Sequence, residues 1–237
     1  MESPLGTHSP SEILSLGKLE GIELDWNGRR YWLLAEKVVY IPDLGTILVA
    51  DAHFGKAAHF RKAGIPIPEK VHVHDFLKIQ KLIKDLAIGE VYFLGDLFHS
   101  DWNTSWDDLE DFAAYFEDCR FHLVKGNHDI LPANMYKPGV WELHVEPVIL
   151  DNFLLSHEPL EVLPSGMLNF CGHIHPGIAM YGTARQRMVL PCFFHKSQQV
   201  ILPAFGRFTG NSPMKSSRED RAFAIAGKKV VEVKFWE

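Results

Sequence analysis

The chain has 237 residues, of which 46% are apolar and 23% are charged. This size and composition are typical of one globular domain, or of one domain with an appended lobe. The net charge of -6 excludes a global basic field that would hold nucleic acid non-specifically, although a local basic patch remains compatible with it.

The cysteines and the lack of a membrane-spanning apolar segment indicate in which compartment the protein resides. The three cysteines, Cys119, Cys171 and Cys192, show no C-x-x-C spacing, which argues against a disulfide framework and against a cysteine-based zinc site. Residues 1–10 lack the pattern of a signal peptide, and no apolar run is long enough to span a membrane. We therefore expect a cytoplasmic protein with reduced thiols and no membrane partner.

The first half of the chain predicts alternating strands and helices. Residues 1–18 are rich in Ser, Pro and Gly and are predicted to be a flexible N-terminal arm, with residues 19–237 forming a single domain. Asn27-Gly28 is a tight-turn signal in a hairpin over 22–34. The elements expected next are a strand at 37–41, a turn at 42–45, a buried strand at 46–50, a helix at 54–63, an extended segment at 65–68, a helix at 70–86, a strand at 91–94, a helix capped by Thr104, and a strand at 121–124.

This alternation indicates a parallel sheet covered by helices. In such sheets the ligand site lies beyond the carboxyl ends of the strands, and each predicted strand ends at a polar group. The second half indicates a second, mostly antiparallel sheet packed on the first. Its strands are expected at 141–145, 148–155, 168–171, 189–194, 199–202, 222–226 and 230–235, with a mobile surface loop at 206–220.

The segment Cys171-Gly-His-Ile-His175 places two imidazoles close together after an apolar run. Imidazole is the commonest protein ligand for metals, yet two nearby histidines alone prove little. The other strand ends supply carboxylates, an amide and further imidazoles, too many ligands for one ion, so we expect two adjacent metals sharing a carboxylate. These strand-end residues are Asp51, His53, Asp96, Asn127, His128, His157, His173 and His175.

These motifs, in this order, resemble the calcineurin-like metallophosphoesterase superfamily. The blocks are Asp51-x-His53, Gly95-Asp96, Gly126-Asn-His-Asp129, His157 and Gly172-His-x-His175. The segments 51–56, 60–66 and 94–100 are also similar to the ligase-associated DNA damage response endonuclease (PdeM-like) branch. The resemblance implies an α/β fold (an α+β sandwich) in which two packed mixed β-sheets are flanked by helices, in four layers.

The resemblance also implies a role for each residue. Asp51, His53 and His175 would bind a first metal, Asn127, His157 and His173 a second, and Asp96 would bridge them. The metals would be divalent, most often Mn²⁺, with Fe or Zn²⁺ as alternatives, and would deprotonate a bridging water that attacks phosphorus. His128 would act as a catalytic acid or stabilise the phosphoryl oxygens, Asp129 would orient His128, and Gly172 keeps the backbone slim beside the metals.

Residues outside the motifs have weaker assignments. Lys56, Arg61 and Lys62 form either a basic lip for a phosphate backbone or a solvated helix face, and the contacts of His99 with substrate are open. Trp102 and Trp106 either stack bases or, as we favour, pack in the core or on the surface. The remaining histidines singled out, His59, His72, His74 and His122, are interpreted as incidental.

The leading hypothesis is therefore a dinuclear metal-dependent phosphoesterase that hydrolyses phosphodiesters. The branch resemblance suggests a DNA-repair nuclease associated with a DNA ligase and a helicase. Two alternatives stay open: hydrolysis of a small nucleotide or lipid-linked phosphate, and a non-catalytic metal-bound scaffold in a repair complex. Fold and site alone do not fix the substrate.

Overall fold

The computed structural model describes residues 13–16, 19–56, 71–98, 102–145, 147–182, 187–207 and 209–234. Their first sheet contains eight strands in chain order, antiparallel from β1 to β5 and parallel from β5 to β8. These strands are β1 (Ile13–Leu16), β2 (Leu19–Trp26), β3 (Arg29–Leu34), β4 (Val38–Ile41), β5 (Thr46–Val49), β6 (Glu90–Leu94), β7 (Arg120–Val124) and β8 (Trp141–His144).

The N-terminal hairpin forms as predicted, and it extends the first sheet. Asn27 and Gly28 have φ angles of 51° and 85°, which fits a turn with the twist that a two-residue hairpin needs. Ile13–Leu16 falls within the predicted flexible arm but pairs with β2 as strand β1. The predicted turn after β4 is a short 3-10 helix, η1 (Pro42–Leu44).

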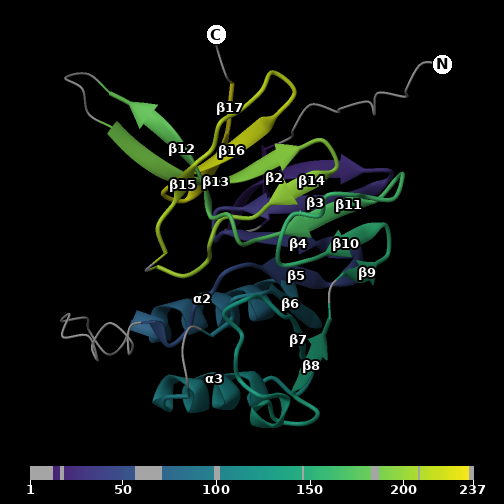
Figure 1. Ribbon diagram of the computed structural model, residues 1–237, viewed down its shortest axis with the longest axis vertical. Coiled ribbons are helices and arrows are strands. Elements are labelled where there is room, and N and C mark those ends of the chain that lie inside the picture. Colours follow the sequence, from purple (N-terminus) through teal and green to yellow (C-terminus); the bar gives the residue numbers. More distant parts are fainter. Residues whose placement is uncertain are drawn as a thin grey trace.

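Helices α2 (Val71–Leu86) and α3 (Thr104–Ala114) cover one face of the parallel half of the first sheet (Figure 1). Alternation along β5 explains this arrangement, because Ile47 and Val49 pack in the cluster with the helices whereas Leu48 packs in the cluster between the sheets. The prediction that Thr104 caps α3 was wrong by one position. Asn103 caps α3, since its side chain accepts a hydrogen bond from Ser105 N at 3.0 Å.

The second sheet is mixed and mostly antiparallel, as expected, but it also contains parallel pairings around β11. Strand β11 pairs in parallel with both β10 and β14, and most of the other pairings are antiparallel. The strands are β9 (Val148–Leu150), β10 (Phe153–Leu155), β11 (Leu168–Cys171), β12 (Pro176–Tyr181), β13 (Arg187–Lys196), β14 (Gln199–Ile201), β15 (Ser212–Pro213), β16 (Arg221–Ala226) and β17 (Lys229–Val233).

Three predictions for this half were incomplete. The segment expected as one strand over 148–155 is two strands, because Asp151 adopts a φ of 57° and turns the chain. Strand β12 was not predicted. The expected surface loop at 206–220 contains β15, which pairs with β12, and it begins at Gly206, which is buried.

The two sheets pack face to face through an apolar layer to which both contribute. Leu48, Leu94 and Val124 come from the first sheet, and Phe153 and Phe170 from the second. This arrangement confirms the predicted fold class of two packed mixed sheets with helices outside. Both described α-helices lie against the first sheet. Neither crosses a membrane by the criteria of length and apolarity.

Candidate metal centre

The carboxyl ends of five strands, from both sheets, meet at one edge of the sandwich. Asp51 follows β5 and hydrogen-bonds through its backbone N–H to Gly95 O, after β6, at 3.3 Å. From the second sheet, His173 N donates to Asp51 Oδ2 at 2.9 Å, and Gly172 N donates to His157 O at 2.9 Å. The packing of the sheets therefore brings together side chains that lie far apart in the sequence.

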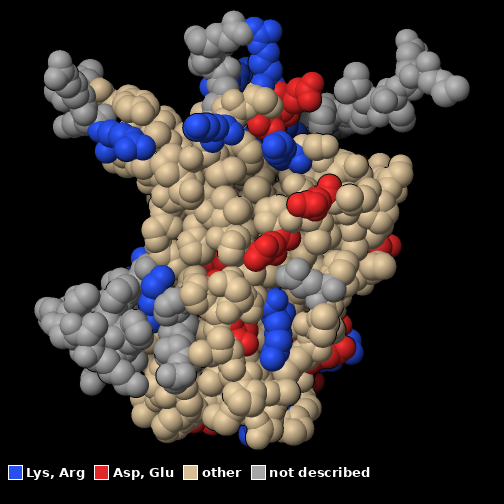
Figure 2. All heavy atoms as spheres, viewed as in Figure 1, with Lys and Arg blue, Asp and Glu red and all other residues tan. Residues whose placement is uncertain are grey.

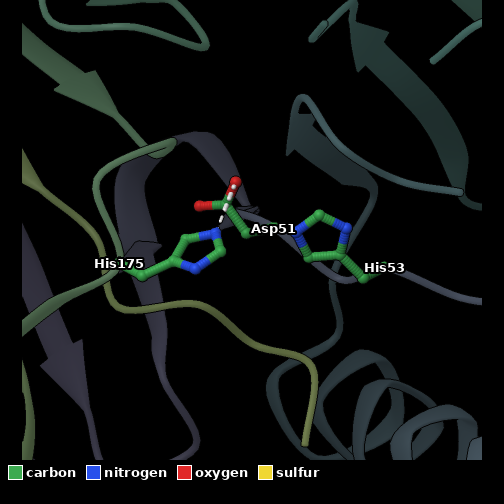
Figure 3. A group of neighbouring side chains, drawn as sticks. All are labelled: Asp51, His53 and His175. Carbon is green, nitrogen blue, oxygen red and sulfur yellow. Dashed lines mark ion pairs between the residues drawn. The ribbon is translucent and has the colours of Figure 1, made fainter. Parts of the chain in front are cut away.

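One group consists of Asp51, His53 and His175, which Figure 3 shows converging from two loops. Asp51 is fully buried, and His175 Nε2 lies 3.4 Å from Asp51 Oδ1. That oxygen accepts no hydrogen bond from the residues that the structure describes. The ring centroids of His53 and His175 are 5.4 Å apart. A buried carboxylate oxygen without a donor, beside imidazole nitrogens, fits a cation.

Asp96 lies between this group and a second one. Its Oδ2 is 3.7 Å from His53 Nε2, and its Oδ1 is 3.5 Å from His157 Nε2. Asp96 is 3% exposed, so water screens its charge poorly. One carboxylate thus faces both groups, which is the placement that a bridging ligand requires.

The second group contains His157, Asn127 and His173. His157 Nδ1 lies 3.0 Å from Leu94 O, and a carbonyl only accepts, so Nδ1 carries a hydrogen. In the neutral ring the lone pair of Nε2 then faces Asn127 Oδ1 at 3.0 Å, with His173 Nδ1 at 3.1 Å. A divalent metal bound by both atoms would satisfy these two acceptors, and their mixed nitrogen and oxygen chemistry fits such an ion.

The backbone at this edge is unusually strained. Five candidate ligands, Asp51, His53, Asp96, His173 and His175, have φ angles between 47° and 65°. L-residues other than glycine seldom adopt this left-handed region, which costs energy and concentrates at functional sites. Sequence patterns gave the identities of these ligands but no sign of the strain.

His128 stands at the rim of the group. Its side chain is 47% exposed, and its Nε2 lies 4.0 Å from Asp96 Oδ2. Its backbone N–H donates to Asp96 Oδ1 at 2.9 Å, which fixes the loop after β7 relative to the loop after β6. His128 is therefore close to the metal groups and open to solvent.

Asp129 is buried and bonded to the backbone. It accepts hydrogen bonds from Leu97 N at 2.9 Å, Phe98 N at 3.3 Å and Gly126 N at 2.9 Å. Burial raises the pKa of Asp129 to about 6, against the lowering effect of these hydrogen bonds. These contacts hold the strand-end loops together, and an orienting contact of Asp129 with His128 stays a prediction from the sequence.

The predicted substrate contacts are only partly described. Lys56 lies near the metal groups: burial lowers the pKa of its ammonium, while Asp96 and Asp51 act in the opposite direction. Arg61, Lys62 and His99 lie outside the described residues. Trp106 is buried in the helix-side core, as favoured from the sequence, and Trp102 is 49% exposed.

Sequence reasoning missed the segment that follows β14. Phe205 N donates to Ala50 O at 2.9 Å, and Gly206 N donates to Asp51 O at 3.2 Å, so this segment fixes the backbone of a candidate ligand. A Cβ at Gly206 would lie 2.4 Å from Ala52 O. The only sequence signal was the apolar run before that glycine.

A family model and one solved structure agree with this geometry. The family model described as "Calcineurin-like phosphoesterase" matches residues 44–195, more than half of the chain. A crystal structure of nuclease MPE from Pseudomonas putida has a TM-score of 0.73 and 28% identity, covering 90% of this chain and 100% of that one. A conserved protein of Streptococcus pneumoniae TIGR4, described as a predicted phosphoesterase, is 11% identical with a TM-score of 0.31, covering 79% and 95%. A search of curated proteins found no match.

The family predicted from the ordered motifs is thus confirmed, and the match to a nuclease agrees with the predicted branch. Members of this family use divalent metals, and the clusters around Asp51 and Asp96 supply candidate ligands for them. The chain belongs to the calcineurin-like phosphoesterase family and is a hydrolase that acts on phosphoester bonds.

Proposed function

We propose that the protein is a dinuclear metal-dependent phosphodiesterase that acts as a nuclease. The observation that carries the proposal is the position of Asp96, whose two carboxylate oxygens face His53 Nε2 at 3.7 Å and His157 Nε2 at 3.5 Å. We assign Asp51, His53 and His175 to a first ion, Asn127, His157 and His173 to a second, and Asp96 to both. Mn²⁺ is the proposed ion, with Fe and Zn²⁺ as alternatives.

When bound, such a pair of ions supplies Lewis-acid stabilisation of the phosphoryl oxygens and lowers the pKa of water. The chain's own residues supply orientation and proton transfer. Asp129 and Asp96 hold the loop of His128 through backbone hydrogen bonds. The exposed His128 ring can then donate a proton to the leaving oxygen, which is poorly stabilised as an alkoxide.

Lys56 is proposed to bind substrate. Its side chain is half-buried, and both Asp51 and Asp96 act on its charge, so it lies within electrostatic reach of the centre. A phosphodiester brings one negative charge, which an ammonium in this position would attract. Arg61 and His99 remain proposed substrate contacts on the grounds of sequence alone.

DNA is the proposed substrate, because the 28% identical neighbour is described as a nuclease and is matched along its whole length. On the face in Figure 2, Lys and Arg are scattered and Asp and Glu lie among them. Among the described residues, this face offers no extended basic patch for DNA, so we propose that the metal centre and the residues beside it attract the substrate. A role in DNA repair, with a DNA ligase and a helicase as partners, is the corresponding biological proposal.

Substitution of the bridging residue tests the mechanism. Asp96→Asn keeps the size of the side chain but removes the charge that would be shared by two cations. We expect it to abolish Mn²⁺-dependent hydrolysis of bis-p-nitrophenyl phosphate, with a loss of at least about 100-fold in kcat. The exposed acidic residue Asp85 supplies the control, Asp85→Asn, which should retain turnover. Equal turnover by Asp96→Asn and the unmodified protein would refute the dinuclear mechanism.

A substrate panel tests the assignment to DNA. Single- and double-stranded DNA should be cleaved in the presence of Mn²⁺, and a chelator should stop the reaction. Hydrolysis of small nucleotides or phosphomonoesters without DNA cleavage would assign the site to the small-molecule alternative. Two bound metals with no hydrolysis of any substrate would indicate a scaffold.

A further inference from the structure

A second group of metal-ligating side chains lies on β7 and β8, apart from the centre described above. The register pairs His122 with Glu142 and Val124 with His144. Residues 142 and 144 share a face of β8, and their partner His122 projects from the same face of the sheet. Three ligating side chains are thus held by regular strands rather than by loops.

The geometry points to a Zn²⁺ site formed by His122, Glu142 and His144, and we propose that these residues bind one zinc ion. His122 Nδ1 lies 3.0 Å from His144 Nε2 and 3.5 Å from Glu142 Oε2. His144 Nε2 lies 3.8 Å from Glu142 Oε1. Tetrahedral zinc with bonds of 2.0–2.1 Å needs ligand atoms about 3.3 Å apart. The separation of 3.0 Å between the two nitrogens and that of 3.5 Å from His122 Nδ1 to Glu142 Oε2 lie on both sides of that value, and a small side-chain rotation of Glu142 would let one oxygen serve both histidines.

The surroundings of His122 favour a ligand over a charged imidazolium. The ring is 3% exposed and stacks on Tyr92 at a centroid distance of 4.1 Å and an angle of 4°. Burial lowers the pKa of His122, although Glu142 and Glu90 oppose the effect. A neutral, fixed ring presents a lone pair, which zinc requires.

The other two ligands leave room for a fourth. The side chain of Glu142 is 59% exposed, and that of His144 is 18% exposed, so water can complete the coordination. Two imidazoles and one carboxylate with an open position match a donor set that zinc accepts. His122 Nε2 is buried with no hydrogen-bond partner among the described residues. Without an outer acceptor on that ring, we expect weaker binding than at fully supported zinc sites.

The location suggests a structural role. Strand β8 is at the edge of the first sheet and pairs with β7 in the described part of the chain. Lys125 N donates to His144 O at 3.3 Å, directly before the loop of Asn127 and His128. Zinc would cross-link β7 and β8 where that loop begins.

Zinc stoichiometry of the full chain tests the proposal. Chelator-treated protein is dialysed against Zn²⁺, and bound zinc per chain is measured by elemental analysis. His144→Ala should bind about one zinc fewer than the unmodified chain, and so should Glu142→Gln, which is close in shape and changes an exposed side chain. The control Glu161→Gln alters an exposed acidic residue outside both groups and should bind as the unmodified chain does.

A double variant separates the two sites. The double variant Asp51→Asn, Asp96→Asn should still bind one zinc, and adding Glu142→Gln should abolish this binding. Zinc should raise the thermal midpoint of the double variant and leave that of the triple variant unchanged. An unchanged zinc count in both His144→Ala and Glu142→Gln would overturn the proposal. The contact between His122 and His144 would then be a hydrogen bond only. Because the readout is stoichiometry, failure of the proposed nuclease activity would not affect the result.

Discussion

Gly172 lies so close to Asp51 that a larger residue has no room. A Cβ at this position would lie 2.5 Å from Asp51 Oδ2 and 2.8 Å from the Cβ of Ala50. Asp51 Oδ2 also accepts the hydrogen bond from His173 N. The glycine therefore allows two ligand-bearing segments, from different sheets, to approach each other.

Gly172→Ala should displace Asp51 without unfolding the protein. We expect kcat/KM for bis-p-nitrophenyl phosphate with Mn²⁺ to fall about 10- to 100-fold, because small displacements of catalytic groups have effects of this size. The matched control is Gly89→Ala, since nothing lies within 4 Å of a Cβ at Gly89. If Gly172→Ala and Gly89→Ala show the same kinetics, the proposed crowding at Asp51 is absent.

Residue identities at the site were largely predictable, whereas their contacts were not. The ordered motifs pointed to Asp51, Asp96 and His173 because polar residues follow apolar strands at fixed places. No pattern predicts that Asp129 bonds to backbone amides 31 and 32 residues earlier, since such contacts depend on how loops meet in space. Glu142 and His144 were likewise invisible as a group until the register of β7 and β8 placed them beside His122.

At the scale of elements, the turn between β3 and β4 is tied to the segment after β14. Lys37 in that turn donates from Nζ to Ala204 O at 2.8 Å. Burial lowers the pKa of Lys37 to about 8, and neighbouring Lys78 and Arg207 act in the same direction. The segment fixed in this way continues to Gly206, which bonds to Asp51 O.

The half-buried Lys37 should make stability depend on pH. Its pKa is near 10.5 when unfolded and about 8 when folded, so between these values the unfolded chain binds more protons and stability rises with pH. This gain in stability is present above the unfolded pKa of 10.5, and it is lost progressively as the pH falls from there to the folded pKa of about 8. Relative to Lys37→Met, the unmodified protein should gain up to about 3 kcal/mol in free energy of unfolding between pH 7.5 and pH 10.5. Urea unfolding of both proteins measures this, and parallel pH curves would contradict it.

The types of the elements could be predicted where the apolar periodicity was strong. Their boundaries were mispredicted where the backbone conformation of single residues ends or divides a strand. The parallel half of the first sheet was predicted from buried strands alternating with helices. Strand β12 was not predicted because it begins with Pro176 and Gly177, which usually indicate a turn. Asp151 divides another expected strand through its left-handed backbone, which a sequence pattern does not reveal.

At the scale of the whole molecule, the stability of the fold depends on the apolar layer between the two sheets. Phe170 is fully buried there, with ring centroids 5.2 Å from Tyr31 of the first sheet and 5.1 Å from Phe153 of the second. Edge-to-face pairs of this kind add to the free energy of burial. The layer holds the two sheets together, and the candidate metal centre lies at its edge.

Phe170→Ala should lower the free energy of unfolding by about 3–5 kcal/mol, because a cavity replaces a buried ring. Denaturant unfolding measures the loss, and Tyr115→Ala, at a side chain that is 65% exposed, should change stability by about 0.5 kcal/mol or less. A loss for Phe170→Ala no larger than for Tyr115→Ala would show that the two sheets do not depend on this layer.

The division of the candidate ligands between two sheets also bears on how the protein is made. During translation, Asp51, His53, Asp96 and Asn127 leave the ribosome before His157, His173 and His175. Strand β14, which supports β11 on its other side, is synthesised later still, at residues 199–201. A nascent chain that has formed only its first sheet holds four of the seven candidate ligands, so metal uptake would report completion of the sandwich rather than the start of folding.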